Sequence, residues 1–275
     1  MTDAVLDLSH TAMPRQIQGN MIAYMRLFNG LSGVSERDDG ETYWIVSGKP
    51  APGNIILRVG LAADADRIEA QIDALFAQTG QHIDEISWFV FPEDHPADLR
   101  QRLEARGMSG GRAGNWLWID LKKLGTAPLL PDKFHIEQVR NDEMMREWLQ
   151  ASEAGFDVGE LEIFYDAYAR HGYGSDAFSL HYIGYLGDTP VTSATLLDAG
   201  GAASIYDVST PTAYRQQGFG GAIMHSLMQE IHHRGYNETW IWSSDMAQTL
   251  YRKLGYVDAD FGIREHVWRK DGTQG

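Results

Sequence analysis

The chain has 275 residues, contains no cysteine and carries a formal net charge of −15. This length allows one large domain or two modest ones. The lack of cysteine excludes disulfides, thiolate zinc sites and a cysteine nucleophile. The negative charge argues against nucleic acid as a partner, because it would repel a phosphate backbone.

The sequence contains no run of 18 apolar residues, so we expect no membrane-spanning segment and no membrane partner. Its start, MTDAVLDLSHTAMPR, has neither the basic region nor the apolar region of a signal peptide. We therefore expect a cytoplasmic protein.

The first part of the chain alternates between helical and strand patterns. Apolar residues recur at helical spacing in one segment, where Ile68, Ile72 and Leu75 share a face. The predicted elements are a helix over about 15–30, strands at 41–48 and 54–61, a helix over 65–80, a strand at 85–91, a helix over 96–107 and a strand at 115–121.

A linker follows at LKKLGTAPLLPDK, where Gly125, Pro128 and Pro131 interrupt regular structure. We place the limits of two domains on either side of it, at 1–125 and 132–275.

The second part mixes hairpins with helical crossovers, which indicates an α/β fold with a mixed-direction sheet. Its predicted elements are a strand at 134–140, acidic helices at 142–155 and 160–171, strands at 177–186, 190–198 and 202–209, a helix over 220–234, a strand at 238–244, a short helix at 245–255 and a tail able to form two more strands. LRQRLEARGM and AQTLYRKLGY hold corresponding places in the two parts. This repetition predicts a diverged internal duplication, although α/β periodicity alone can produce a similar rhythm.

Three glycines, Gly218, Gly220 and Gly221, stand at the start of the helix predicted over 220–234. The first amides of a helix have no partner within the helix and carry partial positive charge. Because glycine has no Cβ, a bulky anion can approach these amides closely. The segment therefore predicts a phosphate or pyrophosphate site.

The pattern around these glycines is neither a Walker loop nor G-x-G-x-x-G. The stretch Arg215-Gln216-Gln217-Gly218-Phe219-Gly220 resembles the pyrophosphate-binding signature of the GCN5-related N-acetyltransferase (GNAT) superfamily. AQTLYRKLGY, downstream, is similar to the superfamily's A-x-x-L-Y-x-K-x-G-F helix. The resemblance extends over residues 132–270.

This resemblance implies a mixed-direction central sheet of the acyl-CoA N-acyltransferase type, in two tandem copies of which the first is degenerate. It also implies acetyl-CoA as co-substrate, without a metal. In the first copy, Asp64 and Asp66 stand where the second has glycines, and they would repel a pyrophosphate. We expect that copy to shape the acceptor pocket or to stabilise the pair.

The resemblance also assigns residues that bind the coenzyme. Val208, Ser209 and Thr210 would pair with the pantetheine arm as if it were a strand. Ser244 stands where many members have an asparagine, and it could equally be the N-cap of the following helix. The pyrophosphate would be held by Arg215, Gln216, Gln217, Gly218, Phe219, Gly220 and Gly221.

Three positions would carry the chemistry by the same resemblance. The amide of Val208 would donate to the oxyanion. Tyr251, also expected at the coenzyme, would protonate the departing thiolate, or it simply packs among the core residues beside it. Asp207 would act as general base, directly or through water, or it forms only a salt bridge. Tyr206 is an alternative polar contact near the amine. A buried amine could also lose its proton to bulk water and need no dedicated base.

We accordingly expect an N-acetyltransferase that moves an acetyl group to an amine of a small molecule or peptide by direct attack. The alternatives are a non-catalytic acetyl-CoA sensor or assembly module, and transfer to oxygen or of a longer acyl chain. An acidic stretch would favour a cationic acceptor, or it is only a solvated helical face. Its acids are Asp142, Glu143, Glu147, Glu153, Asp157, Glu160, Glu162, Asp166 and Asp176. No pattern indicates an oligomeric state.

Overall fold

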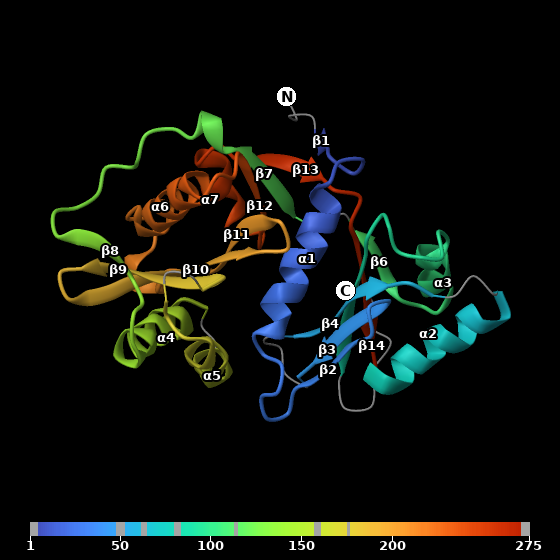
Figure 1. The fold of residues 1–275 in the computed structure, drawn as a ribbon. Helices are drawn as coiled ribbons and strands as arrows, with labels where there is room; N and C mark the ends of the chain where they lie inside the picture. Colours follow the sequence, from blue (N-terminus) through green and yellow to red (C-terminus); the bar gives the residue numbers. More distant parts are fainter. Residues whose placement is uncertain are drawn as a thin grey trace. The chain divides into compact units, whose positions relative to one another are not determined.

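The computed structural model describes residues 5–47, 53–61, 65–79, 84–112, 115–156, 161–174 and 177–270 (Figure 1). The chain divides into two compact units. We call Asp7–Gly114 with Asp260–Gly275 the N-terminal unit, and Met1–Leu6 with Asn115–Ala259 the C-terminal unit.

The N-terminal unit has one sheet, with strand order β2-β3-β4-β5-β14-β6 among the described residues. β4 and β5 pair in parallel through Ile55–Ser87 and Ile56–Trp88, and α2 connects them. Ile56, Trp88 and Ile72 lie in the core between sheet and helices. The elements are α1 (Met13–Arg26), β2 (Ser35–Asp38), β3 (Thr42–Val46), β4 (Asn54–Val59), α2 (Ala65–Thr79), β5 (Glu85–Val90), α3 (Leu99–Ala105), β6 (Ser109–Arg112) and β14 (Arg264–Arg269).

The strands of the C-terminal unit form two groups, ordered β11-β10-β9-β8 and β1-β13-β7-β12. Alternation along β10 gives its sheet two different faces: Ala194 and Leu196 join the core with α6, whereas Ser193 bonds Ser152 of α4. The elements are β1 (Leu6–Asp7), β7 (Trp116–Asp120), β8 (Phe134–Gln138), α4 (Asp142–Phe156), α5 (Glu162–His171), β9 (Ser179–Leu186), β10 (Thr189–Ala199), β11 (Ala202–Ser209), α6 (Phe219–His233), β12 (Glu238–Trp242), α7 (Gln248–Lys253) and β13 (Val257–Asp260), with single 3-10 turns at Leu121–Lys123 and Thr212–Tyr214.

Two strands belong to a different unit from the one that the domain limits expected at 1–125 and 132–275 would give them. β7, expected in the first domain, pairs with β12 and buries Leu117 and Ile119 in the core of the C-terminal unit. β14, expected in the second domain, pairs with β5 and β6 of the N-terminal unit. The linker marks a break in the chain, but strand pairing decides which core each strand completes.

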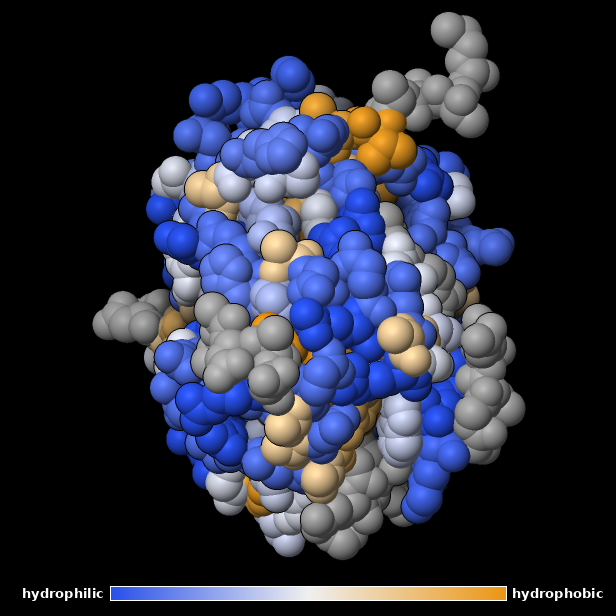
Figure 2. Space-filling model, turned by 90° about the vertical axis from the view of Figure 1, so that its right-hand side faces the viewer, coloured by the Kyte–Doolittle hydropathy of each residue, from blue (hydrophilic) through white to orange (hydrophobic). Residues whose placement is uncertain are grey.

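Most of the predicted helices and strands are confirmed. β2 and β6 were not predicted, because SERD and SGGR contain no alternating apolar residues. The face shown in Figure 2 is mostly hydrophilic, with hydrophobic residues in scattered patches. In the described part of the chain, no helix is long and apolar enough to cross a membrane.

Candidate functional site

A β-bulge interrupts β11 near its end. In the antiparallel pair with β10, Thr195 lies opposite Tyr206 and Ser193 lies opposite Ser209. Between these pairs β11 has two residues, Asp207 and Val208, where β10 has one, Ala194, and Asp207 takes a left-handed φ of 54°. Bulges of this kind turn a side chain away from the direction that regular alternation would give it.

The bulge directs the Asp207 carboxylate to the face of the sheet that α5 covers. Regular alternation would place Asp207 with Ile205, in the core beside α6. Instead its Oδ2 accepts a 2.6 Å hydrogen bond from the hydroxyl of Tyr168 on α5. Tyr206 of β11 is close enough for the charge of Asp207 to add to burial in raising the tyrosine pKa.

β11 and β12 approach each other at the beginning of β11. Ser204 Oγ donates to the carbonyl of Trp240 at 2.6 Å, and Thr239 Oγ1 donates to the carbonyl of Ala203 at 2.7 Å. No backbone ladder joins these two strands where the structure describes them, and each is the edge of its own sheet. The edge of β11 around the bulge can therefore pair with an extended ligand.

The loop before α6 has a row of backbone donors without acceptors. Gln216 and Gly218 take left-handed φ values of 62° and 90°, and Gly218 is the N-cap of α6. The first helical bond runs from the Ala222 amide to the Gly218 carbonyl. Among the described residues, nothing accepts a hydrogen bond from the amides of residues 216–221. Such a concave row at a helix start suits an anion.

The three glycines of this loop have different functions. A Cβ at Gly218 would meet nothing within 4 Å, but the left-handed backbone there disfavours other residues. A Cβ at Gly220 would come within 3.2 Å of Thr210 Oγ1, and one at Gly221 within 3.5 Å of Leu250. Gly218 therefore shapes the loop and Gly220 allows a close approach of Thr210, whereas a Cβ at Gly221 would make only an ordinary contact.

Of the other predicted pyrophosphate residues, two direct their side chains elsewhere. Phe219 is buried and stacks on Phe134 with ring centroids 5.0 Å apart, so only its backbone can face a ligand. Arg215 donates from Nε to the Thr210 carbonyl at 3.0 Å and from Nη2 to the Gly155 carbonyl at 2.5 Å. The guanidinium thus joins the end of α4 to the turn after β11. Gln217 is exposed, and its Nε2 donates to the Ala213 carbonyl at 3.1 Å.

The residues predicted to pair with the pantetheine arm follow the bulge. The side chain of Val208 packs on the core that α6 covers. Ser209 is buried and donates from Oγ to the carbonyls of Ala151 and Ser152 on α4, at 3.3 and 3.2 Å. Thr210 Oγ1 lies 3.0 Å from Thr192 Oγ1. The bonds of Ser209 fix the end of β11 against α4, and the contact of Thr210 holds the following turn against β10.

Tyr251 lies on α7 within the core of the C-terminal unit, 5% exposed. Burial raises its pKa to about 12, so the phenol keeps its proton at neutral pH. Its ring packs edge-on against Tyr256, with centroids 5.9 Å apart. In the described part of the chain, no group forms a hydrogen bond with the Tyr251 hydroxyl.

Ser244 is exposed in the loop before α7, and the suggestion that it caps this helix is wrong. The N-cap is Ala247, which makes no side-chain capping bond. The nearby carboxylate of Asp245 accepts instead from Asn115 Nδ2 at 2.5 Å. A coenzyme contact for Ser244 remains a prediction.

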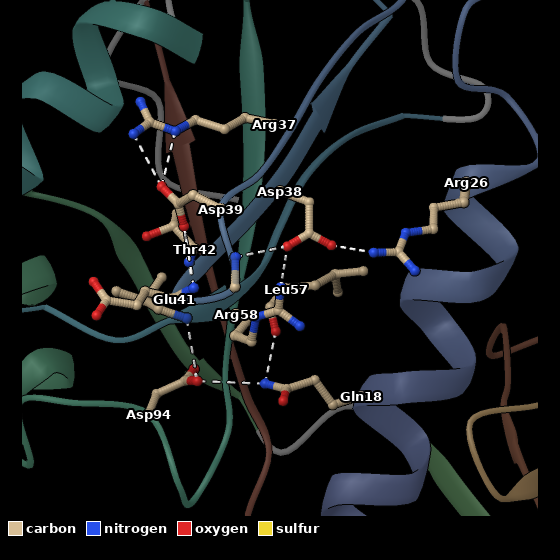
Figure 3. A network of polar contacts seen from close by, with 12 residues as sticks. Gln18, Arg26, Arg37, Asp38, Asp39, Glu41, Thr42, Leu57, Arg58 and Asp94 are labelled. Carbon is tan, nitrogen blue, oxygen red and sulfur yellow. Dashed lines mark hydrogen bonds and ion pairs between the residues drawn. The ribbon is translucent and has the colours of Figure 1, made fainter.

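In the N-terminal unit, the strand that corresponds to β11 is β4, since each is followed by a crossover helix and a further strand. There the Asp94 carboxylate accepts from the Val59 amide at 3.3 Å and from the Phe91 amide at 2.9 Å. The Leu61 amide donates to the His95 carbonyl at 3.1 Å. Figure 3 shows Asp94 beside Gln18 of α1. Asp94 and His95, from a loop of the same unit, therefore accept the hydrogen bonds of the backbone amides at the end of β4. Asp64 and the side chain of Asp66 lie outside the described residues.

Several acids of the predicted acidic stretch have internal partners. Glu162 pairs with Arg146, and Glu147 accepts from the Tyr185 hydroxyl. Asp142 accepts from the Tyr173 hydroxyl at 2.9 Å, and Glu153 from the Leu161 amide at 3.0 Å. Asp157, Glu160 and Asp176 lie outside the described residues. These bonds favour a structural role for much of the stretch and weaken the argument for a cationic acceptor.

Two residues of this site have little signal in the sequence. Tyr168 lies in an aromatic run of its helix, which could line an acceptor site but which core packing also explains. Gly155 lies in α4, and a Cβ there would come within 1.8 Å of Ser209 Oγ. A glycine inside a strongly amphipathic helix is the one signal in the sequence that indicates such close packing.

Residues 177–266 match the family model described as "Acetyltransferase (GNAT) domain". No curated protein matches the chain. The matched segment contains β10, β11, α6, β12 and α7, and thus the bulge and the row of free amides.

Solved structures share the fold over nearly the whole chain. A GCN5-related N-acetyltransferase from Kribbella flavida is 18% identical with a TM-score of 0.62, covering 92% of this chain and 95% of that one. A tandem GNAT protein from the clavulanic acid biosynthesis pathway is 13% identical with a TM-score of 0.59, covering 92% and 88%. A GCN5-related N-acetyltransferase from Sphaerobacter thermophilus is 16% identical with a TM-score of 0.58, covering 94% and 91%. The chain thus has the fold of tandem GNAT proteins.

Proposed function

We propose that this protein is an acetyl-CoA-dependent N-acetyltransferase acting on an amine of a small molecule or peptide, and the match of residues 177–266 to the GNAT acetyltransferase model supports this. The observation that carries the proposal is the row of backbone amides over residues 216–221, at the positive end of α6, which have no acceptor in the described part of the chain. A helix start whose amides were buried or already hydrogen-bonded could not bind an anion, whereas the amides of this helix start suit a diphosphate.

The coenzyme would be held mainly by backbone groups. The amides of residues 216–221 would bind its pyrophosphate, while Arg215 maintains the turn from behind. The unpaired edge of β11 at Val208 would receive the pantetheine arm in the manner of an added strand. Ser209 and Thr210 would support this edge through their bonds to α4 and β10.

When bound, acetyl-CoA supplies a thioester whose acetyl carbon the amine attacks, so that a C–N bond replaces the C–S bond. The amide of Val208, at the bulge of β11, would donate to the carbonyl oxygen. Asp207 would take the proton that the amine loses. Tyr251 would return a proton to the sulfur, and its raised pKa makes it a weaker acid than a free phenol.

We propose further that each chain binds one coenzyme, in the C-terminal unit. The Val59 amide of the N-terminal unit already donates to Asp94, and the Leu61 amide to His95. A thioester carbonyl entering there would have to displace a buried carboxylate that accepts several hydrogen bonds.

Calorimetric titration with coenzyme A tests the site. Gln217 is exposed, so Gln217→Glu adds a negative charge beside the amides without disturbing the core. We expect one site per chain and, in the variant, affinity about ten-fold weaker, corresponding to about 1.4 kcal/mol. Gln217→Ala is the matched control, because it also loses the bond to Ala213 but adds no charge.

Transfer is tested by free-thiol release from acetyl-CoA with a panel of polyamines, aminoglycosides, amino acids and peptides. Coenzyme binding without turnover on any amine would identify a sensor or assembly module instead. Equal affinity in Gln217→Glu and the wild type would contradict the pyrophosphate site itself.

A further inference from the structure

We infer that the acceptor amine carries an aromatic ring and that Trp242 selects it; this rests on the proposed function, in which the amine reacts beside Asp207. A chain of ring contacts leads from that position to the surface of the C-terminal unit. Tyr206 packs edge-on against Trp240, with ring centroids 6.1 Å apart. Trp116 connects Trp240 with Trp242, at centroid distances of 5.6 and 5.9 Å. We call these four aromatic residues the aromatic cluster.

The cluster lies on the same face of its strands as the Asp207 carboxylate. Ile205 of β11 joins the core with α6, so alternation turns Tyr206 to the opposite face. In the same way, Ile241 turns the tryptophans of β12 to that face. The bulge directs the Asp207 carboxylate there as well. An amine that reacts at Asp207 would therefore bring its carbon body against the cluster.

Trp242 lies beside the reacting position although it belongs to another strand. β11 and β12 run side by side, and the two hydrogen bonds between them join positions 203 and 204 to positions 239 and 240 (Figure 1). Because these contacts advance together, the strands run in the same direction. Two residues further along, Trp242 stands level with Tyr206, which directly precedes Asp207.

Trp242 is also the accessible end of the cluster. Its ring stacks on Trp116 with the two planes 25° apart, and the residue is 42% exposed. A ring that stacks through one face can hold a second ring against the other. Trp116 and Trp240 are each 2% exposed and support it from within the unit. An anchor held in this way loses little freedom when it binds a ligand.

The cluster suits an aromatic body better than a second positive charge. Trp240 Nε1 is buried without a hydrogen-bond partner among the described residues, so ring packing holds this side chain. Glu238, on the same face of β12, already accepts from Trp118 Nε1 at 2.7 Å. A polyamine would therefore meet ring surface where its second cation needs a carboxylate. An aromatic ring would instead gain ring contacts in addition to burial.

The first test compares two amines of similar size, phenylethylamine and cyclohexylethylamine, in the thiol-release assay, with spermidine as a third acceptor. In the wild type we expect kcat/KM to be about five-fold higher for the aromatic amine, since both amines bury a ring but only one makes ring–ring contacts. Trp242→Ala should lose this preference and leave KM for acetyl-CoA unchanged. Trp242→Phe retains a ring and should retain most of the preference.

Phe178→Ala is the matched control. Phe178 is 37% exposed, but its carbonyl accepts from the Asp198 amide, and Asp198 pairs with Ala203 at the start of β11 rather than at its bulge. This variant should match the wild type with every amine. Calorimetry with coenzyme A on Trp242→Ala checks that the coenzyme site has remained folded.

A second readout does not depend on turnover. Each amine is titrated calorimetrically into protein saturated with coenzyme A, and phenylethylamine should bind more tightly than cyclohexylethylamine in the wild type but equally in Trp242→Ala. No binding of phenylethylamine, equal affinities in the wild type, a preference that survives in Trp242→Ala, or a preference for spermidine overturns the inference. A wild type that acetylates no amine instead removes the proposed function, while these affinities still decide whether Trp242 selects an aromatic ring.

Discussion

The carboxylate of Asp94 lies 3.3 Å from the backbone nitrogen of Val59, where the other unit has the unpaired end of β11. Asp94 is 8% exposed, and burial raises its pKa to about 7 despite bonds from the Phe91 and Val59 amides and from Gln18. Burial of the Asp94 carboxyl at the end of β4 therefore makes the stability of the N-terminal unit depend on pH.

We expect this stability to fall as the pH rises from about 4 to about 7. The unfolded carboxyl has a pKa near 3.8 and the folded one near 7, so in this window the folded state binds more protons. The loss is on the order of 2–4 kcal/mol, since one pKa unit corresponds to about 1.4 kcal/mol. Above pH 7 Asp94 contributes no further change. Urea unfolding at pH 5 and pH 8 measures the difference.

The control for this prediction is a variant in which the side chain at position 94 no longer titrates. Asp94→Asn should show a smaller difference between the two pH values, whatever its absolute stability. Glu93→Gln removes a neighbouring exposed carboxylate and should retain the wild-type difference. An equal pH dependence in Asp94→Asn and the wild type would contradict the assignment to Asp94.

A second prediction concerns two neighbouring tyrosines, Tyr251 and Tyr256. Both are buried in one core with ring centroids 5.9 Å apart, and only Tyr251 is the proposed general acid. Tyr251→Phe should lower kcat by about 10²-fold, within the usual range for a general acid, and retain affinity for coenzyme A. The measurement is steady-state thiol release, combined with calorimetry.

Tyr256→Phe is the matched control, because the Tyr256 hydroxyl is buried and has no hydrogen-bond partner among the described residues. Removing it should leave kcat unchanged and should not destabilise the protein. If the two variants lose turnover equally, the effect comes from core packing and Tyr251 is not the acid.

The sequence predicted those features of the site that depend on local pattern. The glycines at 218–221 indicated the start of α6, where Gly218 takes a left-handed φ of 90°, and the strand predicted at 202–209 is β11 with its observed limits. The helix predicted over 220–234 is α6, Phe219–His233, and Gly235 just beyond its end takes a φ of 97°.

Features that depend on contacts distant in sequence could not be predicted in this way. The bond between Tyr168 and Asp207 joins residues 39 positions apart, and neither residue type specifies such a partner. Arg215 was expected at the pyrophosphate because it belongs to the stretch that resembles the GNAT signature, but its guanidinium binds two carbonyls, one of them 60 positions away. β7 and β14 each join a sheet in the unit that the sequence did not assign to them. Strand pairing decides this, and local periodicity does not contain that information.

A third prediction tests the close contact between α4 and the end of β11. In a helix, glycine to alanine normally stabilises by about 1 kcal/mol. At Gly155, however, the added Cβ would meet Ser209 Oγ at 1.8 Å and the Thr210 nitrogen at 2.9 Å. Overpacking of this kind costs about 1–3 kcal/mol or more, so we expect Gly155→Ala to lower the free energy of unfolding. Because the strand end must move, affinity for coenzyme A should fall as well.

Two further variants separate this contact from a general effect of alanine. Gly125→Ala should be neutral, since a Cβ there meets nothing within 4 Å. Ser209→Ala removes the atom closest to the new Cβ, so combining it with Gly155→Ala should recover part of the lost stability, as coupled neighbours do. The recovery should be partial, because the Thr210 backbone remains at 2.9–3.0 Å. Additive losses in the double variant would show that α4 and β11 do not meet at Gly155, and that the end of β11 is supported in another way.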